Sequence, residues 1–153
     1  MPLAYHHHMG TVIETQKDTE RLIENTHESV KLTLDTGHML FAKGDSKYIL
    51  QNYHERILHV HCKDIRKQVL EKSLKEDLSF RGAFLEGAFT VPGDGCIDYQ
   101  PLFNVLKNNN YSGWLVVEAE QDPAKANPLE YAKIGYNYLT DTLKKSEIEI
   151  YKN

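Results

Sequence analysis

Apolar and polar positions along the chain form blocks that predict strands and helices in alternation. Four short runs rich in aliphatic and β-branched residues, each bounded by turn or helix signals, predict buried strands at 3–14, 30–35, 57–61 and 114–118. Apolar residues at helical spacing predict helices at 18–25, 46–55, 98–106 and 128–143. This βαβαβαβα order is typical of an α/β protein with a parallel sheet and right-handed crossovers.

The third connection, residues 63–95, is much longer than the others. Loops of that length within a compact domain are usually functional. Asp98 is expected to cap the helix that follows. We interpret residues 1–153 as one domain and expect the mostly polar residues 144–153 to form a frayed tail.

Composition argues against several partners and locations. The 153 residues include 18 Lys and Arg against 22 Asp and Glu, for a net charge of −4, and 41% are hydrophobic. A chain of this balance lacks the basic footprint of a nucleic-acid-binding protein, and no apolar run approaches the roughly 20 residues that span a membrane. The first ten residues lack the pattern of a secretion signal, and Cys62 and Cys96 form no C-x-x-C pair. We therefore expect a cytoplasmic protein with neither a nucleic-acid nor a membrane partner.

Each predicted strand ends in a side chain that can bind a metal ion. These residues are Glu14, Asp35, His61 and Glu118. The carboxyl ends of parallel strands meet at one edge of the sheet, where the active sites of α/β folds form. Three carboxylates and one imidazole favour Mn²⁺, Co²⁺ or Mg²⁺ over thiolate-seeking ions. A single acid at a strand end is often only a solvated helix cap, but four in four strands predict a metal site.

Further polar side chains are expected beside these ligands. Residues two apart on a strand share a face, so His59 and Lys63 are expected to point the same way as His61, and Glu120 the same way as Glu118. They predict a second polar layer around the metal site.

Histidines elsewhere are candidates for the same site. Gly37 permits a tight turn that would bring His38 back over the site, the alternative being a surface-loop histidine. In the run His6-His7-His8, alternation places His6 and His8 on one face, where they are candidates for binding a polyol substrate, and His7 on the other. The alternative for this run is a purification tag or an ordinary strand.

Cys62 lies beside His61, but neighbouring residues on a strand face opposite sides of the sheet. Cys62 is therefore expected to pack outward against a helix rather than act as a nucleophile. Gly93-Asp94-Gly95 lacks the third glycine and the preceding strand of a dinucleotide-binding motif.

Five segments together resemble the inosose dehydratase family, within the xylose-isomerase-like TIM barrel superfamily. They are YHHHMGT (5–11), LDTGH (34–38), HVHCKD (59–64), FTVPGDGCID (89–98) and VVEAEQDP (116–123). The triple histidine, the PGDG loop and the EAEQDP segment resemble the dehydratase specifically. Strands that end in Asp and His are common to many related sugar isomerases and epimerases.

The resemblance implies the C-terminal half of a (β/α)8 barrel, with four βα units that correspond to strands five to eight, since members of the family are full eight-stranded barrels. A half-barrel has two open edges and an exposed inner face, which favours pairing with another chain. We therefore expect either a homodimer or assembly with a complementing N-terminal half-barrel.

Position by position, the resemblance implies metal ligation by Glu14, Asp35, His61 and Glu118. The implied ion is Mn²⁺ or Co²⁺, with Mg²⁺ as an alternative, and glutathione is a further cofactor that the family suggests.

The implied reaction is loss of water from a cyclic polyol ketone, 2-keto-myo-inositol (scyllo-inosose). A carboxylate, Glu118 or Glu14, takes the α-proton, and His38, His59 or Lys63 supplies the proton for the departing hydroxyl. His6, His8 and His59 would bind the substrate.

Three other interpretations stay open. A ketose epimerase or isomerase of the same superfamily would use the same metal without expelling hydroxide. A catalytically silent half-barrel would only assemble with a complementary chain. A DNA-repair nuclease is disfavoured because the chain lacks excess basic charge.

Overall fold

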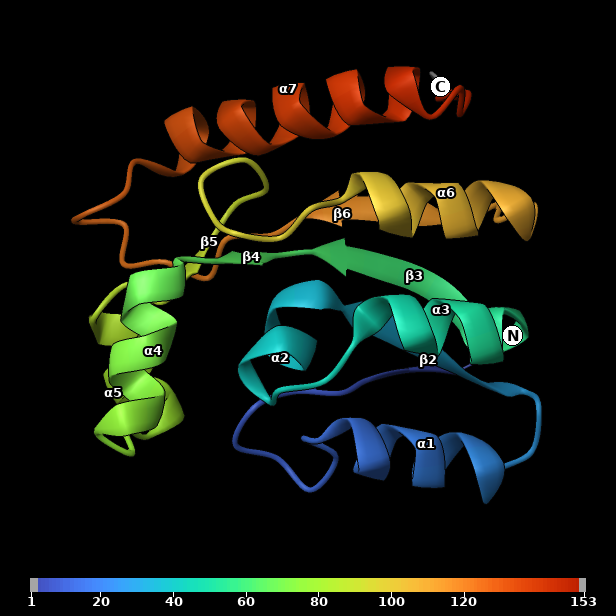
Figure 1. Cartoon of the computed structure of the whole chain (residues 1–153), viewed down its shortest axis with the longest axis horizontal. Coiled ribbons are helices and arrows are strands. Elements are labelled where there is room, and N and C mark those ends of the chain that lie inside the picture. Colours follow the sequence, from blue (N-terminus) through green and yellow to red (C-terminus); the bar gives the residue numbers. More distant parts are fainter. Residues whose placement is uncertain (1–2, 152–153) are drawn as a thin grey trace.

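A four-stranded parallel sheet lies at the centre of the protein, whose computed structural model describes residues 3–151 (Figure 1). Its strands, in spatial order, are β1 (Leu3–His6), β2 (Val30–Asp35), β3 (Ile57–Cys62) and β6 (Trp114–Val117). Every neighbouring pair is parallel, so the predicted α/β class is confirmed. β1 and β6 are the edge strands of this sheet.

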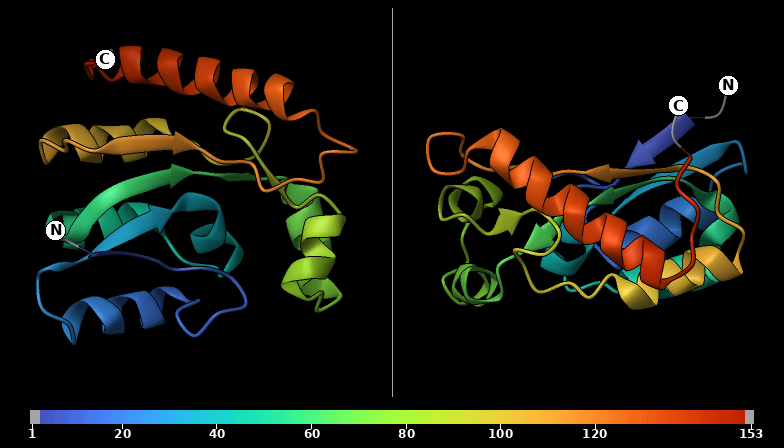
Figure 2. Two further views of the ribbon diagram at one scale, coloured as in Figure 1. Left: turned by 180° about the vertical axis from the view of Figure 1, so that it is seen from behind. Right: turned by 90° about the horizontal axis from the view of Figure 1, so that it is seen from above.

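Helices cover one face of the sheet (Figure 2). They are α1 (Gln16–Glu24), α3 (Ser46–Tyr53) with the 3-10 turn η1 (His54–Arg56), α6 (Gln100–Asn108) and α7 (Pro128–Lys145). The main hydrophobic core fills the space between these helices and the sheet; its strand residues include Leu32, Leu34, Val60 and Cys62. The outward packing predicted for Cys62 is therefore confirmed.

The opposite face of the sheet carries polar and exposed apolar side chains. Thr33, His59 and Trp114 are register partners across three strands, one layer below the pair formed by Asp35 and His61. Trp114 is 63% exposed, and Val116 beside it is also exposed. Apolar side chains on an uncovered sheet face are typical of a surface that another element covers.

The long third connection is folded rather than an open loop. It contains β4 (Asp64–Ile65), α4 (Lys67–Lys75), α5 (Phe80–Leu85) and β5 (Phe89–Thr90), and β4 pairs with β5 in antiparallel fashion. This unit lies beyond the carboxyl end of β3 and has its own small core (Figure 1).

The predicted strand over 3–14 is wrong beyond His6, where β1 ends. Gly10 adopts a φ of 74°, and the backbone N–H of His8 donates to Ile13 O at 3.0 Å. This turn takes the chain out of the sheet. The sequence predicted that Glu14 ends a strand, but Glu14 instead lies just before Thr15, the N-cap of α1.

Two further differences from expectation concern helices. His38 is not in a loop but in the short helix α2 (Thr36–Phe41), whose N-cap is Asp35. α6 begins at Gln100 with Tyr99 as its N-cap residue, while Asp98 Oδ1 accepts the backbone N–H of Gln100. The expected cap by Asp98 is thus displaced by one residue.

The first residues of the expected tail continue the last helix or pack against the core. α7 continues through Lys145, Ser146 is buried, and Ile148 packs against the main core. The last part of the expected tail, residues 152–153, lies outside the described residues. Among residues 3–151, no helix is both long and apolar enough to cross a membrane.

Candidate metal centre

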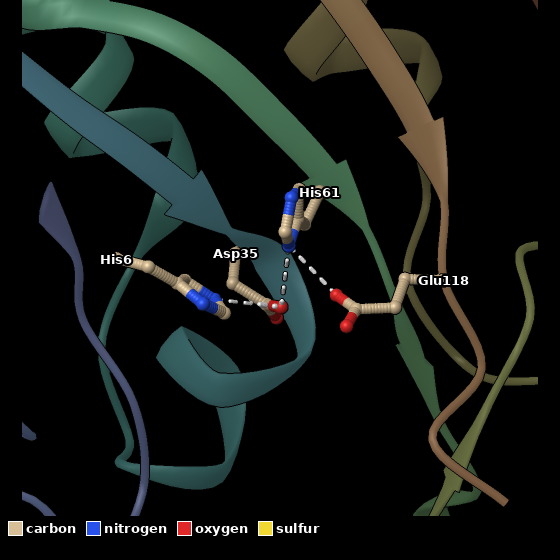
Figure 3. Close-up of side chains that lie close together, drawn as sticks. All are labelled: His6, Asp35, His61 and Glu118. Carbon is tan, nitrogen blue, oxygen red and sulfur yellow. Dashed lines mark hydrogen bonds and ion pairs between the residues drawn. The ribbon is translucent and has the colours of Figure 1, made fainter. Parts of the chain in front are cut away.

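Four side chains from the four parallel strands meet at the carboxyl edge of the sheet (Figure 3). His6 and Asp35 are the last residues of β1 and β2, His61 is on β3, and Glu118 directly follows β6. One ligand atom of each lies within 4.8 Å of the others. We call these residues the four-ligand group.

The spacing within the four-ligand group suits a divalent cation. Asp35 Oδ2 lies 3.3 Å from His6 Nε2 and 3.8 Å from His61 Nδ1, and His61 Nδ1 lies 2.7 Å from Glu118 Oε2. Bonds of about 2.1 Å in a tetrahedral arrangement would place ligand atoms about 3.4 Å apart. His61 Nδ1 and Glu118 Oε2 are both buried without a hydrogen bond of good geometry in the described chain. Both atoms are thus available to a metal ion.

Asp35 is held through both carboxylate oxygens. Oδ1 accepts the backbone N–H of His38 at 2.8 Å, and Oδ2 faces His6 and the ammonium of Lys63, which is 3.3 Å away. Burial acts to raise the pKa of Asp35, but the hydrogen bond from His6 and the charge of Lys63 hold that pKa well below its usual range. Asp35 is therefore ionised and ready to ligate.

The other carboxylate and the imidazole beside it also have shifted pKa values. Contact with the Glu118 carboxylate raises the pKa of His61, although burial opposes the change. Burial acts to raise the pKa of Glu118, but the contact with His61 and the charge of Lys63 lower it overall. A bound cation would compete with the proton on His61 for the same atom.

A second group of side chains lies directly beside the first. Glu120 Oε2 is 3.1 Å from His38 Nε2, and Glu120 Oε1 is 3.5 Å from His8 Nε2. Lys63 Nζ contacts Glu120 Oε2, and it lies 2.9 Å from His38 Nε2. The side chain of Lys63 is 0% exposed. We call His8, His38, Lys63 and Glu120 the lysine cluster.

Charge pairing sets the protonation of the lysine cluster. Burial acts to raise the pKa of Glu120, but hydrogen bonds from His38 and Lys63 lower it to about 2. The pKa of Lys63 is raised, because Asp35 and Glu120 outweigh its burial, and burial lowers the pKa of His38. An ammonium–carboxylate pair with a neutral imidazole follows from these shifts.

Backbone strain and an aromatic wall shape the lysine cluster. Glu120 adopts a φ of 51°, in the left-handed region that non-glycine residues rarely occupy. Such conformations persist where surrounding contacts enforce them, and they concentrate at functional sites. Phe80 of α5 closes one side of the cluster, with its ring centroid 5.1 Å from that of His8.

His7 supports the site from below. Its ring is buried, and Nε2 accepts the backbone N–H of Asp35 at 3.1 Å. Burial lowers the pKa of His7 to about 3, so the ring is neutral. The placement of His6 and His8 toward the site, with His7 turned away, agrees with the alternation of the triple histidine.

The structure does not gather every residue that the sequence selected. Glu14 belongs to neither group; its Oε2 accepts the backbone N–H of Gly10 at 2.8 Å instead. His6, selected only for substrate binding, stands where Glu14 was expected. His59 lies on β3 one layer below His61 and also belongs to neither group. Lys63 and His38 do lie beside the ligands.

The sequence placed Glu120 in the second polar layer, on the same face as Glu118, but its φ of 51° could not be read from that spacing. One residue of the site, Phe80, was not selected from the sequence. Phe80 reaches the site because α4 and α5 fold back, which no local pattern shows.

Comparison with known proteins places the fold. The family model described as xylose isomerase-like TIM barrel matches residues 1–142. The inosose dehydratase of Clostridium beijerinckii is 52% identical over 142 residues, which cover 92% of this chain and 48% of that protein. The inosose dehydratase of Lactiplantibacillus plantarum is 49% identical, over 94% of this chain and 48% of that protein. The rhizopine catabolism protein MocC of Rhizobium meliloti is 51% identical, over 90% of this chain and 42% of that protein. The chain thus spans about half the length of these curated relatives.

Solved structures with lower sequence identity share the fold. A crystal structure of the protein IolI with a bound zinc atom superposes with a TM-score of 0.68 at 19% identity, over 95% of this chain and 50% of that one. The probable 3-DHS dehydratase AsbF of Bacillus anthracis gives a TM-score of 0.66 at 18% identity, over 92% of this chain and 49% of that one. At this identity the likeness concerns the fold alone.

Proposed function

The chain belongs to the xylose isomerase-like TIM barrel family, and we propose that it carries the metal centre of an inosose dehydratase and supplies half of that enzyme's barrel. The proposal rests on one observation above all: the four-ligand group converges at the carboxyl edge of the sheet, in a chain about 50% identical to inosose dehydratases. In this family fold, active sites form at that edge.

The donor set refines the choice of metal. With His6 in place of Glu14, the group offers two imidazoles and two carboxylates. Imidazole nitrogens suit Mn²⁺, Co²⁺ or Zn²⁺ better than Mg²⁺, which prefers an all-oxygen shell. We propose His6, Asp35, His61 and Glu118 as the ligands and Mn²⁺ or Co²⁺ as the ion.

In the proposed reaction, 2-keto-myo-inositol loses water and gives a diketone after tautomerisation. When bound, the metal supplies Lewis-acid polarisation of the ketone. The chain must then remove an α-proton and protonate the β-hydroxyl as it leaves. The Glu118 carboxylate is the base that we propose, because the Glu14 carboxylate is tied to Gly10 and lies outside the site.

The lysine cluster is the proposed source of the second proton. Lys63 Nζ and His38 Nε2 both face Glu120 Oε2, so two donors converge beside the ligands. Loss of hydroxide is the step that a dehydratase needs and an epimerase does not. His8 would help to hold the polyol, since its Nε2 points into the same cluster.

Three more expectations stay proposals. The uncovered sheet face and the open edges of β1 and β6 favour pairing with a second copy or with a complementing N-terminal half-barrel. A cytoplasmic location and a role for glutathione stay predictions from the sequence and its resemblance.

Assays on purified protein test the proposed function. The chain, loaded with Mn²⁺ or Co²⁺, is incubated with 2-keto-myo-inositol and separately with fructose or tagatose, alone and mixed with the N-terminal half of a relative. Dehydration of the cyclitol ketone supports the proposal. Turnover of the ketoses alone would establish the epimerase or isomerase instead. Metal binding without turnover in any mixture would favour a silent half-barrel.

A further inference from the structure

The lysine cluster contains a ligand set of its own. Side-chain atoms of His8, His38 and Glu120 lie within 4.8 Å of one another. Two imidazoles and one carboxylate are a common ligand set for a divalent cation in proteins. By composition alone, the site could therefore hold a second metal ion next to the first.

The ammonium of Lys63 contacts two of these three side chains, His38 and Glu120. Its Nζ contacts Glu120 Oε2 and is 2.9 Å from His38 Nε2. The same Nζ lies 3.3 Å from Asp35 Oδ2 and 3.4 Å from Glu118 Oε2, so it also touches the four-ligand group. One cation thus contacts all three carboxylates of the site.

The packing around Lys63 leaves its side chain little room to move aside. A Cβ atom on Gly37 would come within 2.7 Å of Lys63 Cγ, so the stem of the lysine fills the space above that glycine. The backbone N–H of Lys63 donates to Thr36 Oγ1, and Nζ lies 5.6 Å from the centroid of the Phe89 ring. The side chain has no exposed surface through which to leave.

Charge balance gives the same answer as geometry. Asp35, Glu118 and Glu120 carry three negative charges, which one divalent ion and one ammonium neutralise. With the ammonium in place, a second divalent ion would leave two excess positive charges in a buried site, where repulsion is weakly screened; without the ammonium the excess falls to one. The backbone N–H of Met9 points at His38 Nδ1, 3.5 Å away, so Nε2 is the ring nitrogen that faces Glu120 and Lys63.

We propose that Lys63 is a built-in cation that occupies the second ligand cluster and limits the centre to one metal ion. Replacing Lys63 by a small neutral residue would then open a second metal site on His8, His38 and Glu120. This proposal rests on the proposed metal centre as its neighbour, but it concerns the difference between two variants.

Metal stoichiometry tests the proposal directly. The wild-type chain, Lys63→Ala and the double variant Lys63→Ala with His8→Ala are dialysed against MnCl₂ or CoCl₂ alone, and the metal is counted by elemental analysis. We expect one ion per chain in the wild type, two in Lys63→Ala and one in the double variant. The second Mn²⁺ should also give an exchange-coupled electron paramagnetic resonance signal. One ion in Lys63→Ala, or two in the wild type, would overturn the proposal.

If circular dichroism shows that Lys63→Ala does not fold, the single variant His8→Ala, which retains Lys63, provides a second test. If Lys63 fills the cluster, His8→Ala alone leaves both stoichiometry and Co²⁺ affinity unchanged. A wild type that binds two ions, one of them lost in His8→Ala, contradicts the proposal. If the wild type binds no ion while Lys63→Ala gains one that His8→Ala removes, the proposed function fails and the role of Lys63 stands.

Discussion

Asp35 caps the helix that carries His38: its Oδ1 accepts the backbone N–H of His38 at 2.8 Å, while its Oδ2 faces the other ligands. One side chain therefore ends a strand, starts α2 and contributes to the four-ligand group. The proposed metal ligation and the local folding are coupled at this residue, and a substitution can separate them.

Asp35→Asn should weaken Mn²⁺ binding more than about a hundredfold, because the amide cannot supply the anionic ligand. Mutating a residue that only hydrogen-bonds to a metal ligand costs up to about a hundredfold. Asparagine is a good N-cap residue, so the capping of α2 should survive. Asp35→Ala should lose both functions, with an additional loss of about 1 kcal/mol from the missing cap. Calorimetric titration with Mn²⁺ and thermal unfolding of both variants check this. Unchanged Mn²⁺ affinity in Asp35→Asn would remove Asp35 from the ligand set.

Separate substitutions of His6 and Glu14 test which of the two residues belongs to the ligand set. His6→Ala should lower Mn²⁺ affinity strongly, because it removes one of four converging ligand atoms. Glu14→Ala should leave the affinity unchanged, since the Glu14 carboxylate binds the Gly10 backbone instead. The same calorimetric titration measures both variants. A large loss in Glu14→Ala with none in His6→Ala would restore the ligand set inferred from the sequence.

The replacement of Glu14 by His6 in the proposed ligand set shows which parts of the site can be predicted from the sequence. The order of strands along the chain and the candidate ligands Asp35 and His61 follow from apolar runs that end in polar residues, because period and termination are local properties. The first strand was misplaced because Val12 and Ile13 extend an apolar pattern past Gly10, where the backbone has in fact turned. Strand alternation places Lys63 and Glu120 in one polar layer, but no local pattern encodes the direct contact between these residues, which are more than 50 positions apart.

His7 should make stability depend on pH. Its pKa is lowered from 6.5 to about 3 in the folded chain. Between these values the unfolded chain binds a proton that the folded chain does not, so the free energy of unfolding falls as pH drops from about 6.5 toward 3, by at most about 1.4 kcal/mol per pH unit. Urea unfolding of the metal-free protein at several pH values measures the slope.

His7→Gln is the matched variant, because its amide oxygen can accept the Asp35 N–H without titrating. It should flatten that slope while keeping most of the stability at pH 7. His7→Leu should flatten it too, but at a cost of about 1–3 kcal/mol for the unpaired buried N–H. An unchanged slope in both variants would assign the acid sensitivity to other groups.

The uncovered sheet face predicts self-association. Trp114 lies on edge strand β6 and is 63% exposed, which is costly for so large an apolar side chain. Trp114→Glu should shift the chain toward monomer in light scattering at micromolar concentration. Leu129→Glu, at a helix position that is 64% exposed, is the matched control and should not change the mass. A wild type that is a monomer with a cooperative thermal transition would contradict the prediction.

Metal binding and turnover should separate in this chain. All four proposed ligands lie within it, so Mn²⁺ should bind to the chain alone. A barrel active site is also walled by loops from the strands that the chain lacks relative to a full eight-stranded barrel. A misplacement of about 1 Å can cost on the order of a hundredfold in rate, so the loss of half the wall should reduce dehydration of 2-keto-myo-inositol to a weak or undetectable level.

Adding the N-terminal half of a relative should restore turnover, and Glu118→Gln should abolish the restored activity because it removes the proposed base. A coupled assay for the diketone product follows both. The contrary result would be turnover by the purified 153-residue chain at the rate of a full-length relative, lost on Glu118→Gln. Since each copy brings its own four-ligand group, that result would mean that two copies complete each other's pocket.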